Sequence, residues 1–454
     1  MTAPAARPRP ARRALDELSL PVDASLLEGF AAEEPDWLTA DRRAAFDAWS
    51  SLPGESNVLY TPYIDLRAAQ LDEAHIVVRL VPDGASSEGL PADVAGLIEV
   101  TDGHVSTAAL SAEARGAGVV VRSLLDDLDA VRDELSDVTA IAASDKFAQL
   151  TRAAWSQGVL VDVPAGAVID RPIVVRWAVG SAGQALFTRT IVRIGDGASA
   201  TIVEEFVAGP HADPTAAQSL FAGTMEVHVG AGAALQVASL QELPPNVVAF
   251  EHRAADIGEG ASLQWALAQL GGRLVRSRVD NRLIGDRSSV TQVEIVFGSD
   301  EQLFDLSSFT THIGKDTTGD LLSKAALLEK SRTYLKGLIT IERSANGTDS
   351  FLGEFGMNLS KDARSVAIPS LEIDQPDCRR AMHSSSVGPI DETQLFYLES
   401  RGIPPDEARK IIVLGFLEPV VARVPLASAQ DRLRELLEEK WIAGTDGVAG
   451  EAAA

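Results

Sequence analysis

Two residues near the end of the chain have side chains that bind transition metals and lie close together in the sequence. Cys378 and His383 are five residues apart, with Met382 between them. A thiolate and a neutral imidazole are ligands for iron or zinc, but two ligands make only half of a tetrahedral site. Because Cys378 is the only cysteine, any further thiolate must come from another molecule. The spacing therefore favours a shared metal site over a self-contained one.

The remaining motifs offer little independent chemistry. The seven histidines include no His-x-His pair and no His-Glu-x-x-His motif, so an autonomous zinc site is not expected. Three Gly-x-Gly copies lack the third glycine of a dinucleotide-binding loop, and no Walker A loop occurs. Paired acids such as Asp126-Asp127 and Glu204-Glu205 are common in so acidic a chain. A carbohydrate-active β-helix enzyme with converging carboxylates remains a distant alternative.

The composition limits the classes of partner. The chain has 454 residues and a formal net charge of −25, which argues against binding to nucleic acid or anionic membranes. A hydrophobic content of 46% permits a large core. One cysteine excludes an internal disulfide and favours a cytoplasmic location. Residues 1–13 carry four arginines with no apolar segment behind them, so a signal peptide is not expected.

A glycine motif recurs through the middle of the chain. IGDGA (194–198) returns as VGAGA (229–233) and IGEGA (257–261), with weaker copies at 284–286 and 313–315. The intervals between the first glycines are 35, 28, 27 and 29 residues. Such a period, with β-branched stretches between tight turns, predicts a β-solenoid; a β-sandwich would have closer turns and no self-similar motif. Later turn signals at half this spacing suggest two strands and two turns per coil.

The fold class that follows is mainly β, with a right-handed parallel β-helix core at 158–388. Residues 14–157 form a mixed N-terminal region, with helices expected near 41–49, 126–135 and 145–157 and short strands near 76–81 and 97–100. Residues 389–443 form a C-terminal helical domain, whose apolar stripes must pack on the solenoid or on a partner. Residues 1–13 and 444–454 are expected to be disordered tails.

The junction between solenoid and helices resembles the SufB/SufD family of iron–sulfur cluster assembly proteins. The similarity lies in IPSLEI (368–373), HSSSVGPID (383–391), QLFYL (394–398) and SRGI (400–403). The segment 323–332 and GLI (337–339) resemble the late solenoid of the same family. The resemblance is strong over 285–425 and weaker over 158–285.

This resemblance implies a non-catalytic scaffold in a SufB–SufC–SufD complex. The β-helix would pair with a SufB-like paralogue, with a homodimer as an alternative, and the C-terminal helices would dock a SufC-like ATPase. His383 falls on the family's functional histidine at the interface where the nascent cluster forms. The isolated chain would then hold no tightly bound cofactor, and iron or a nascent cluster would bind at the partner interface.

Departures from the family pattern favour SufD over SufB. SufB has a cluster-ligand cysteine about two turns before the histidine, where this chain has Glu354, a weak metal candidate. SufB follows the histidine with Glu, whereas Ser384 follows here. Cys378 also lies off the position where SufD often has a cysteine, so it is a weak candidate. A SufB-type scaffold remains the alternative, because residues 311–315 are more similar to SufB.

Three residues of the helical domain are candidates for contact with the ATPase. Tyr397 and Phe416 would serve as aromatic anchors and Arg401 as a charge at the rim. Ordinary helix packing explains the two aromatic residues equally well.

Overall fold

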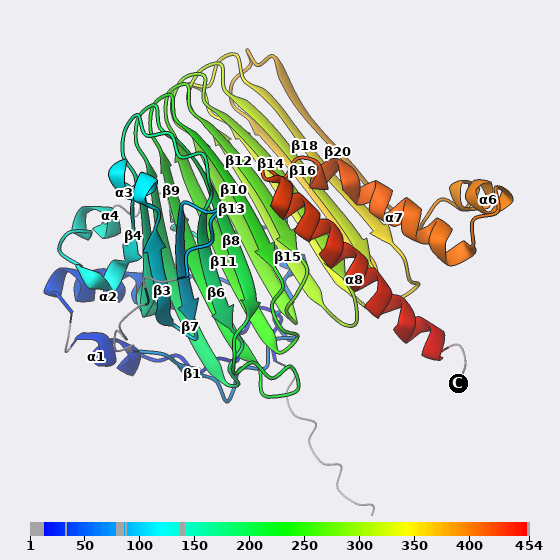
Figure 1. The fold of residues 1–454 in the computed structure, drawn as a ribbon, viewed down its shortest axis with the longest axis horizontal. Coiled ribbons are helices and arrows are strands. Elements are labelled where there is room, and N and C mark those ends of the chain that lie inside the picture. The colour runs from blue at the N-terminus through cyan, green and yellow to red at the C-terminus, as the bar shows by residue number, and fades with distance from the viewer. Residues whose placement is uncertain (1–12, 32–33, 79–85, 87–88, 137–140, 452–454) are drawn as a thin grey trace, which may run out of the picture.

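The chain folds as a parallel β-helix that is flanked by helices on two sides (Figure 1). The computed structural model describes residues 13–31, 34–78, 86, 89–136 and 141–451. The predicted tail 1–13 lies almost wholly outside these ranges, as does the second half of the strand predicted at 76–81; β1 (His75–Ile76) ends at the first residue of that prediction. No helix in the described part of the chain is long and apolar enough to cross a membrane.

Two ten-stranded sheets form the walls of the β-helix, and each coil contributes one strand to each wall. Sheet 1 consists of β1, β4 (Val120–Ser123), β5 (Gln157–Val163), β7 (Gln184–Ile194), β9 (Ser219–Val229), β11 (Val247–Ile257), β13 (Leu274–Leu283), β15 (Leu303–His312), β17 (Arg332–Ile341) and β19 (Arg364–Ile373). Sheet 2 consists of β2 (Gly96–Thr101), β3 (His104–Leu110), β6 (Ile173–Val179), β8 (Ser199–Ala208), β10 (Ala234–Gln241), β12 (Ser262–Gln269), β14 (Ser289–Gly298), β16 (Thr318–Leu327), β18 (Asp349–Asn358) and β20 (Arg380–Gly388). The predicted arrangement of two strands and two turns per coil is confirmed.

The coils stack in register, so that residues one coil apart lie side by side. In sheet 2, Leu235 pairs with Leu263 and Leu263 pairs with Val290. Alternate residues point into the β-helix, and the largest apolar cluster fills that interior. A side chain therefore belongs to an inner or an outer row that runs along the whole β-helix.

The recurring glycines form the turns that lead from sheet 1 to sheet 2. The first glycine of each copy has no room for a side chain: a Cβ at Gly285 would lie 2.0 Å from the backbone nitrogen of Glu259 in the preceding coil. The second glycine has a positive φ, +66° at Gly197 and +64° at Gly232. In the two weaker copies Arg287 and Asp316 adopt this conformation instead. The period in the sequence thus comes from the close stacking of these turns.

The N-terminal region covers the outer face of sheet 1. Its main helices are α1 (Ser25–Ala31), α2 (Asp36–Ser51) and α5 (Lys146–Ala154), and shorter helical segments are η1 (Thr61–Tyr63), α3 (Ala112–Gly116), η2 (Leu124–Asp126) and α4 (Arg132–Ser136). Apolar residues of these helices pack against outward side chains of sheet 1, including Phe147 against Phe250 at a ring distance of 4.7 Å. The strands β2 and β4 of this region also extend the two sheets.

The helix predicted at 126–135 is wrong over its first half. Asp127 has an extended conformation, and its Oδ1 accepts a hydrogen bond from the backbone nitrogen of Ala130 at 3.0 Å. Such a side-chain turn competes with helical hydrogen bonding. Only α4 remains helical in this segment.

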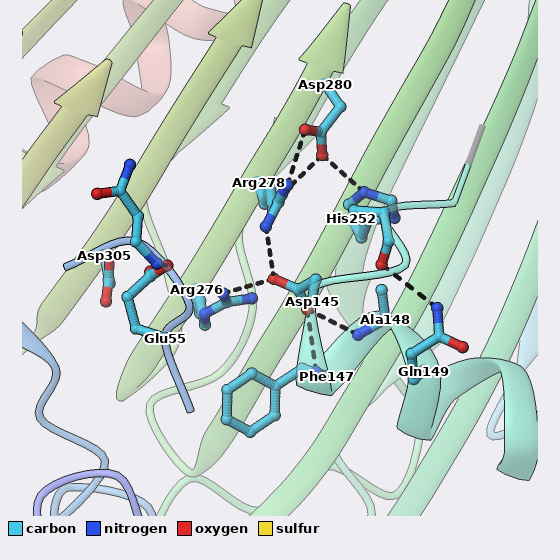
Figure 2. A network of polar contacts seen from close by, with 12 residues as sticks. Glu55, Asp145, Phe147, Ala148, Gln149, His252, Arg276, Arg278, Asp280 and Asp305 are labelled. Atoms are coloured by element: carbon cyan, nitrogen blue, oxygen red, sulfur yellow. Dashed lines mark hydrogen bonds and ion pairs between the residues drawn. The ribbon is translucent and has the colours of Figure 1, made fainter. Parts of the chain in front are cut away.

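A charged network fastens α5 to sheet 1 (Figure 2). Oδ1 of Asp145 accepts hydrogen bonds from the backbone nitrogens of Phe147 and Ala148 at 3.0 and 2.8 Å, which caps the helix. Its Oδ2 accepts hydrogen bonds from Arg276 at 2.6 Å and Arg278 at 3.3 Å, both on β13. Burial alone would raise the pKa of Asp145, but the two guanidinium groups outweigh burial and hold this pKa well below its usual range.

The C-terminal helices cover the outer face of sheet 2. The helices α7 (Pro405–Val421) and α8 (Ala427–Glu451) lie across this sheet, and α6 (Glu392–Ser400) projects away from it (Figure 1). Val413, Leu417 and Leu437 pack with outward residues of β10, β12 and β14. The apolar stripes predicted from the sequence are therefore buried on the chain's own β-helix. The helix α8 continues to Glu451, beyond the boundary predicted at 443.

Replacing Gly285 with Ala should destabilise the β-helix. The new methyl group would meet the backbone of the preceding coil, so we expect the free energy of unfolding to fall by about 1–3 kcal/mol. Gly415→Ala in α7 is a matched control, because no atom lies within 4 Å of the added Cβ; it should raise this free energy by up to about 1 kcal/mol. Urea unfolding followed by circular dichroism measures both. Equal stability of the two variants would contradict the tight stacking.

Candidate functional site

The last coil leaves one end of the β-helix uncovered. The strands β19 and β20 end the two sheets, and each pairs with a neighbour on one side only. Every side chain of β20 is exposed or half-buried, unlike those of the preceding strands. Unpaired strand edges offer backbone donors and acceptors to a further strand. This open end is therefore a surface at which another sheet can add.

His383 lies on β20 at this open end. It pairs in register with Leu352, which continues the inner row from Leu321, and both leucines are buried in the interior. The register therefore places the imidazole on the inner side of the last coil, where it is exposed because no further coil covers it. Within the described ranges no side chain or backbone group hydrogen-bonds to it. The nitrogens of this imidazole are therefore available to a metal ion.

Glu354 lies on the strand next to His383. It is on β18, two residues beyond the partner of His383, so strand geometry puts the two Cα atoms about 8 Å apart. Glu354 and His383 are one coil apart in the chain. Because each coil has two turns, this matches the interval of about two turns given by the family resemblance. Glu354 is only 1% exposed, and its Oε2 accepts a hydrogen bond from the backbone nitrogen of Ile368 at 2.9 Å. The carboxyl group therefore spans the interior from sheet 2 to sheet 1.

Gly337 makes room for this carboxyl group. A Cβ at position 337 would lie 2.7 Å from Oε1 of Glu354 and 2.4 Å from a methyl carbon of Leu352. Gly337 belongs to the GLI segment by which the sequence resembles the family, and the structure supplies a reason for it. A side chain at this position would push the carboxyl group away from sheet 1.

The buried position of Glu354 changes its protonation. Burial raises its pKa to about 8, and the hydrogen bond from Ile368 only partly offsets this effect. At neutral pH the group is therefore mostly a neutral carboxylic acid. A cation that bound there would displace the proton.

Glu354 is the outermost member of a polar column inside the β-helix, which the sequence analysis missed. Deeper in the column, Arg253 forms ion pairs with Glu251 at 2.7 Å and with Glu204. Glu294 lies between these groups and Glu354, and burial raises its pKa to about 7. Within the described ranges, neither Glu294 nor Glu354 forms an ion pair. The only signal in the sequence was acidic residues recurring at about one coil's spacing within strands.

Cys378 is not brought together with these residues. It lies in the turn before β20, half-buried, and packs beside Leu371 and Ala381. Among the described residues, no group of three His, Cys, Asp or Glu side chains is arranged to hold a metal ion. His383 and Glu354 are thus neighbouring candidate ligands, and a metal site there would need further ligands from a partner; Cys378 stays a weak candidate.

A second candidate surface lies on α6. Tyr397 is 57% exposed, and the guanidinium group of Arg401 stacks over its ring at 5.2 Å. Phe396, which the sequence analysis did not single out, is 71% exposed. In the described structure α6 has no buried residue, so its aromatic side chains are available to a partner.

Phe416 has a different environment from Tyr397. It is half-buried against the cluster under α7, and the ammonium group of Lys324 lies 4.5 Å from its ring centre. Lys324 also donates a hydrogen bond to the carbonyl oxygen of Phe416 at 2.6 Å. Phe416 therefore holds α7 on β16, and the exposed aromatic anchor is on α6.

Comparison with known proteins agrees with this architecture. Residues 177–416 match the model of the family described as "SUF system FeS cluster assembly, SufBD core domain". The iron-sulfur cluster assembly protein SufD of Bacillus subtilis is 27% identical over 448 residues, which cover 93% of this chain and 98% of that protein. An iron-sulfur cluster assembly SufBD family protein of Staphylococcus epidermidis is 28% identical over 293 residues, or 64% of this chain. The chain spans 62% of the length of that staphylococcal relative.

The fold and site define a β-helix protein with an open end, at which an exposed histidine lies one strand away from a buried carboxylic acid. The match over more than half of the chain identifies it further: the chain belongs to the SufBD family of the SUF iron–sulfur cluster assembly system. The family resemblance inferred from the sequence is confirmed.

Glu354→Gln should change how stability depends on pH. The native wild type keeps a proton that the unfolded chain, with its ordinary pKa of 4.5, releases. Its free energy of unfolding should therefore carry a contribution that falls as the pH rises from about 4.5 to about 8. The variant lacks this contribution and should be more stable than the wild type at pH 8.5, with little difference at pH 4.

Urea unfolding at a series of pH values measures this effect. Glu342→Gln is the matched control, because Glu342 is exposed in a turn and should leave the slope unchanged. A Glu354→Gln variant with the wild-type slope would show that Glu354 is ionised in the native protein.

Proposed function

We propose that the chain is a SufD-type, non-catalytic subunit of a cytoplasmic iron–sulfur cluster assembly complex. The observation that carries the proposal is the uncovered end of the β-helix, where His383 lies beside the carboxylic acid of Glu354. Similarity to the Bacillus subtilis SufD over nearly the whole chain supports the SufD type. The absence of a cysteine at position 354 argues against the alternative, a SufB-type scaffold.

The open end would pair with the end of a SufB-like β-helix. The edges of β19 and β20 would receive strands from this paralogue, which would extend both sheets across the interface. Iron is the cargo at this interface. His383 would bind it through a neutral imidazole, and the thiolates would come from the partner. Glu354 would lose its proton as the cation arrives.

The helix α6 would dock a SufC-like ATPase. Tyr397 and Phe396 offer aromatic anchors, and Arg401 supplies a charge at the rim. The helices α7 and α8 hold this surface on sheet 2. ATP binding in the partner would then act on the interface through subunit movement, with no chemical step on this chain.

Co-expression with a SufB-like chain and a SufC-like ATPase tests the assembly. We expect the three chains to co-purify as one complex, and the chain alone to hold no stable cluster under anaerobic conditions. Failure to co-purify would overturn the proposed complex. A stoichiometric cluster on the isolated chain would favour the SufB-type alternative.

His383→Ala should lower the iron content of the complex without unfolding the chain. The imidazole of His383 makes no hydrogen bond within the described ranges, so its loss costs little stability, whereas loss of a metal ligand should weaken iron binding by about 10-fold or more. Iron and cluster content of the anaerobic complex are measured by elemental analysis and absorption spectroscopy. His211→Ala, in an exposed turn, is the control. Unchanged iron content would reject the ligand role of His383.

A further inference from the structure

A short loop of the N-terminal region crosses the outer face of the last coils. This loop, residues 55–63, is tightly hydrogen-bonded. The backbone nitrogen of Asn57 donates to the side chain of Glu55 at 2.9 Å, and Oδ1 of Asn57 accepts from the backbone nitrogen of Leu59 at 2.9 Å. The carbonyl oxygen of Asn57 also accepts from the backbone nitrogens of Tyr60 and Thr61. The conformation of the loop is therefore fixed by its own contacts.

Tyr60 anchors the loop close to the open end. It is fully buried, and its hydroxyl group donates to the carbonyl oxygen of Gly337 on β17 at 2.8 Å. Its ring stacks on Phe309 of β15, with 5.9 Å between the ring centres, and Ser370 of β19 lies beside its hydroxyl group. The loop thus lies over β15, β17 and β19, the last three strands of sheet 1.

The base of the loop is also held by charge. Glu55 is buried on the side of the loop that faces Arg276 and Arg278, and its negative charge raises the pKa of both guanidinium groups (Figure 2). Burial lowers these two pKa values, and the surrounding carboxylates outweigh that effect. The loop is therefore fixed at Tyr60, and its start at Glu55 is attracted more weakly by the two arginines than Asp145 and Asp280 are.

Between Glu55 and Tyr60 the loop exposes apolar side chains. Val58 is 81% exposed and Leu59 is 53% exposed. Neither side chain contributes to the cores that hold the N-terminal region on sheet 1. The open end itself exposes Ile373, Met382 and Val387 by 40–50%. Because Tyr60 fixes the loop beside β19, Val58 and Leu59 flank the edge of sheet 1 at which a further strand would add.

We propose that Val58 and Leu59 form a second contact for the chain that adds strands to β19 and β20, a β-helix of the same family. The partner would pack an apolar flank of its own last coil against these two side chains. Their rigid presentation reduces the conformational entropy lost on binding. The contact would fix the angle between the two β-helices, which edge pairing alone leaves variable. This inference rests on the proposed function, because it assumes the paralogous partner.

The test compares the affinity of variants of the full chain for a purified SufB-like partner by isothermal titration calorimetry. Val58→Asp with Leu59→Asp places two charges in the contact, and Val58→Ala with Leu59→Ala removes the side chains without charge. Val168→Asp is the matched control, because Val168 is 62% exposed in the turn of the first coil. We expect the aspartate pair to weaken binding at least 10-fold and the alanine pair to weaken it less. The control should bind like the wild type.

The outcomes separate this contact from the proposed function. If the wild type does not bind the SufB-like partner, the proposed function fails. If the wild type binds the partner and both loop variants bind it with the affinity of the wild type, the proposed contact is wrong. If the loop variants instead abolish self-association of this chain and leave the partner's affinity unchanged, the occupant is a second copy and the proposal is wrong. Unchanged thermal unfolding of the variants shows that any loss comes from the interface.

Discussion

The stacking of coils in register is the constraint on which the rest of the structure depends. In the later coils of sheet 2, backbone hydrogen bonds join each strand to the strand one coil away, so every side chain shares its row with residues 27–31 positions earlier and later. The rows decide which residues meet. One inner row brings Glu294, Ser323 and Glu354 into line, and another brings Leu352 beside His383. The strands of the last coil keep unpaired backbone N–H and C=O groups along their outer edges. These edges can pair with a further strand unless another segment covers them.

The interior is more polar than a β-helix core needs for stability. Arg253 forms ion pairs with Glu204 and Glu251, but among the described residues neither Glu294 nor Glu354 forms one, and burial raises their pKa values to about 7 and about 8. A pair of uncharged acids inside the wall costs stability once the pH rises. Gly337 leaves space for the carboxyl group of Glu354, which lies nearest the open end.

Much of this architecture could be predicted from the sequence, for a physical reason. The turns stack so closely that only glycine fits at positions 195, 230, 258, 285 and 314. The spacing of these glycines in the sequence therefore gives the length of a coil. The polar column and the network around Asp145 were not predictable, because their members lie on different coils, with 133 residues between Asp145 and Arg278, and meet only once the register is known. The role of Phe416 was also undecided, since exposure and packing leave the same helical pattern. The first part of the helix predicted at 126–135 was wrong because the side chain of Asp127 forms a turn there, whereas α4 is helical from Arg132.

The link between Tyr60 and Gly337 has a consequence for the order of events during synthesis. The two residues are separated by 277 positions, and Asp145 similarly waits for Arg276 and Arg278. At about 5–20 residues per second, the ribosome needs roughly 15–55 s to make the strand that receives Tyr60 after Tyr60 itself has been made. The loop around Tyr60 is therefore translated early, but it reaches its final position only after the late coils have been made. Its closure over sheet 1 reports that the late coils have formed, so the nascent chain carries a built-in check on completion of the end that meets the partner.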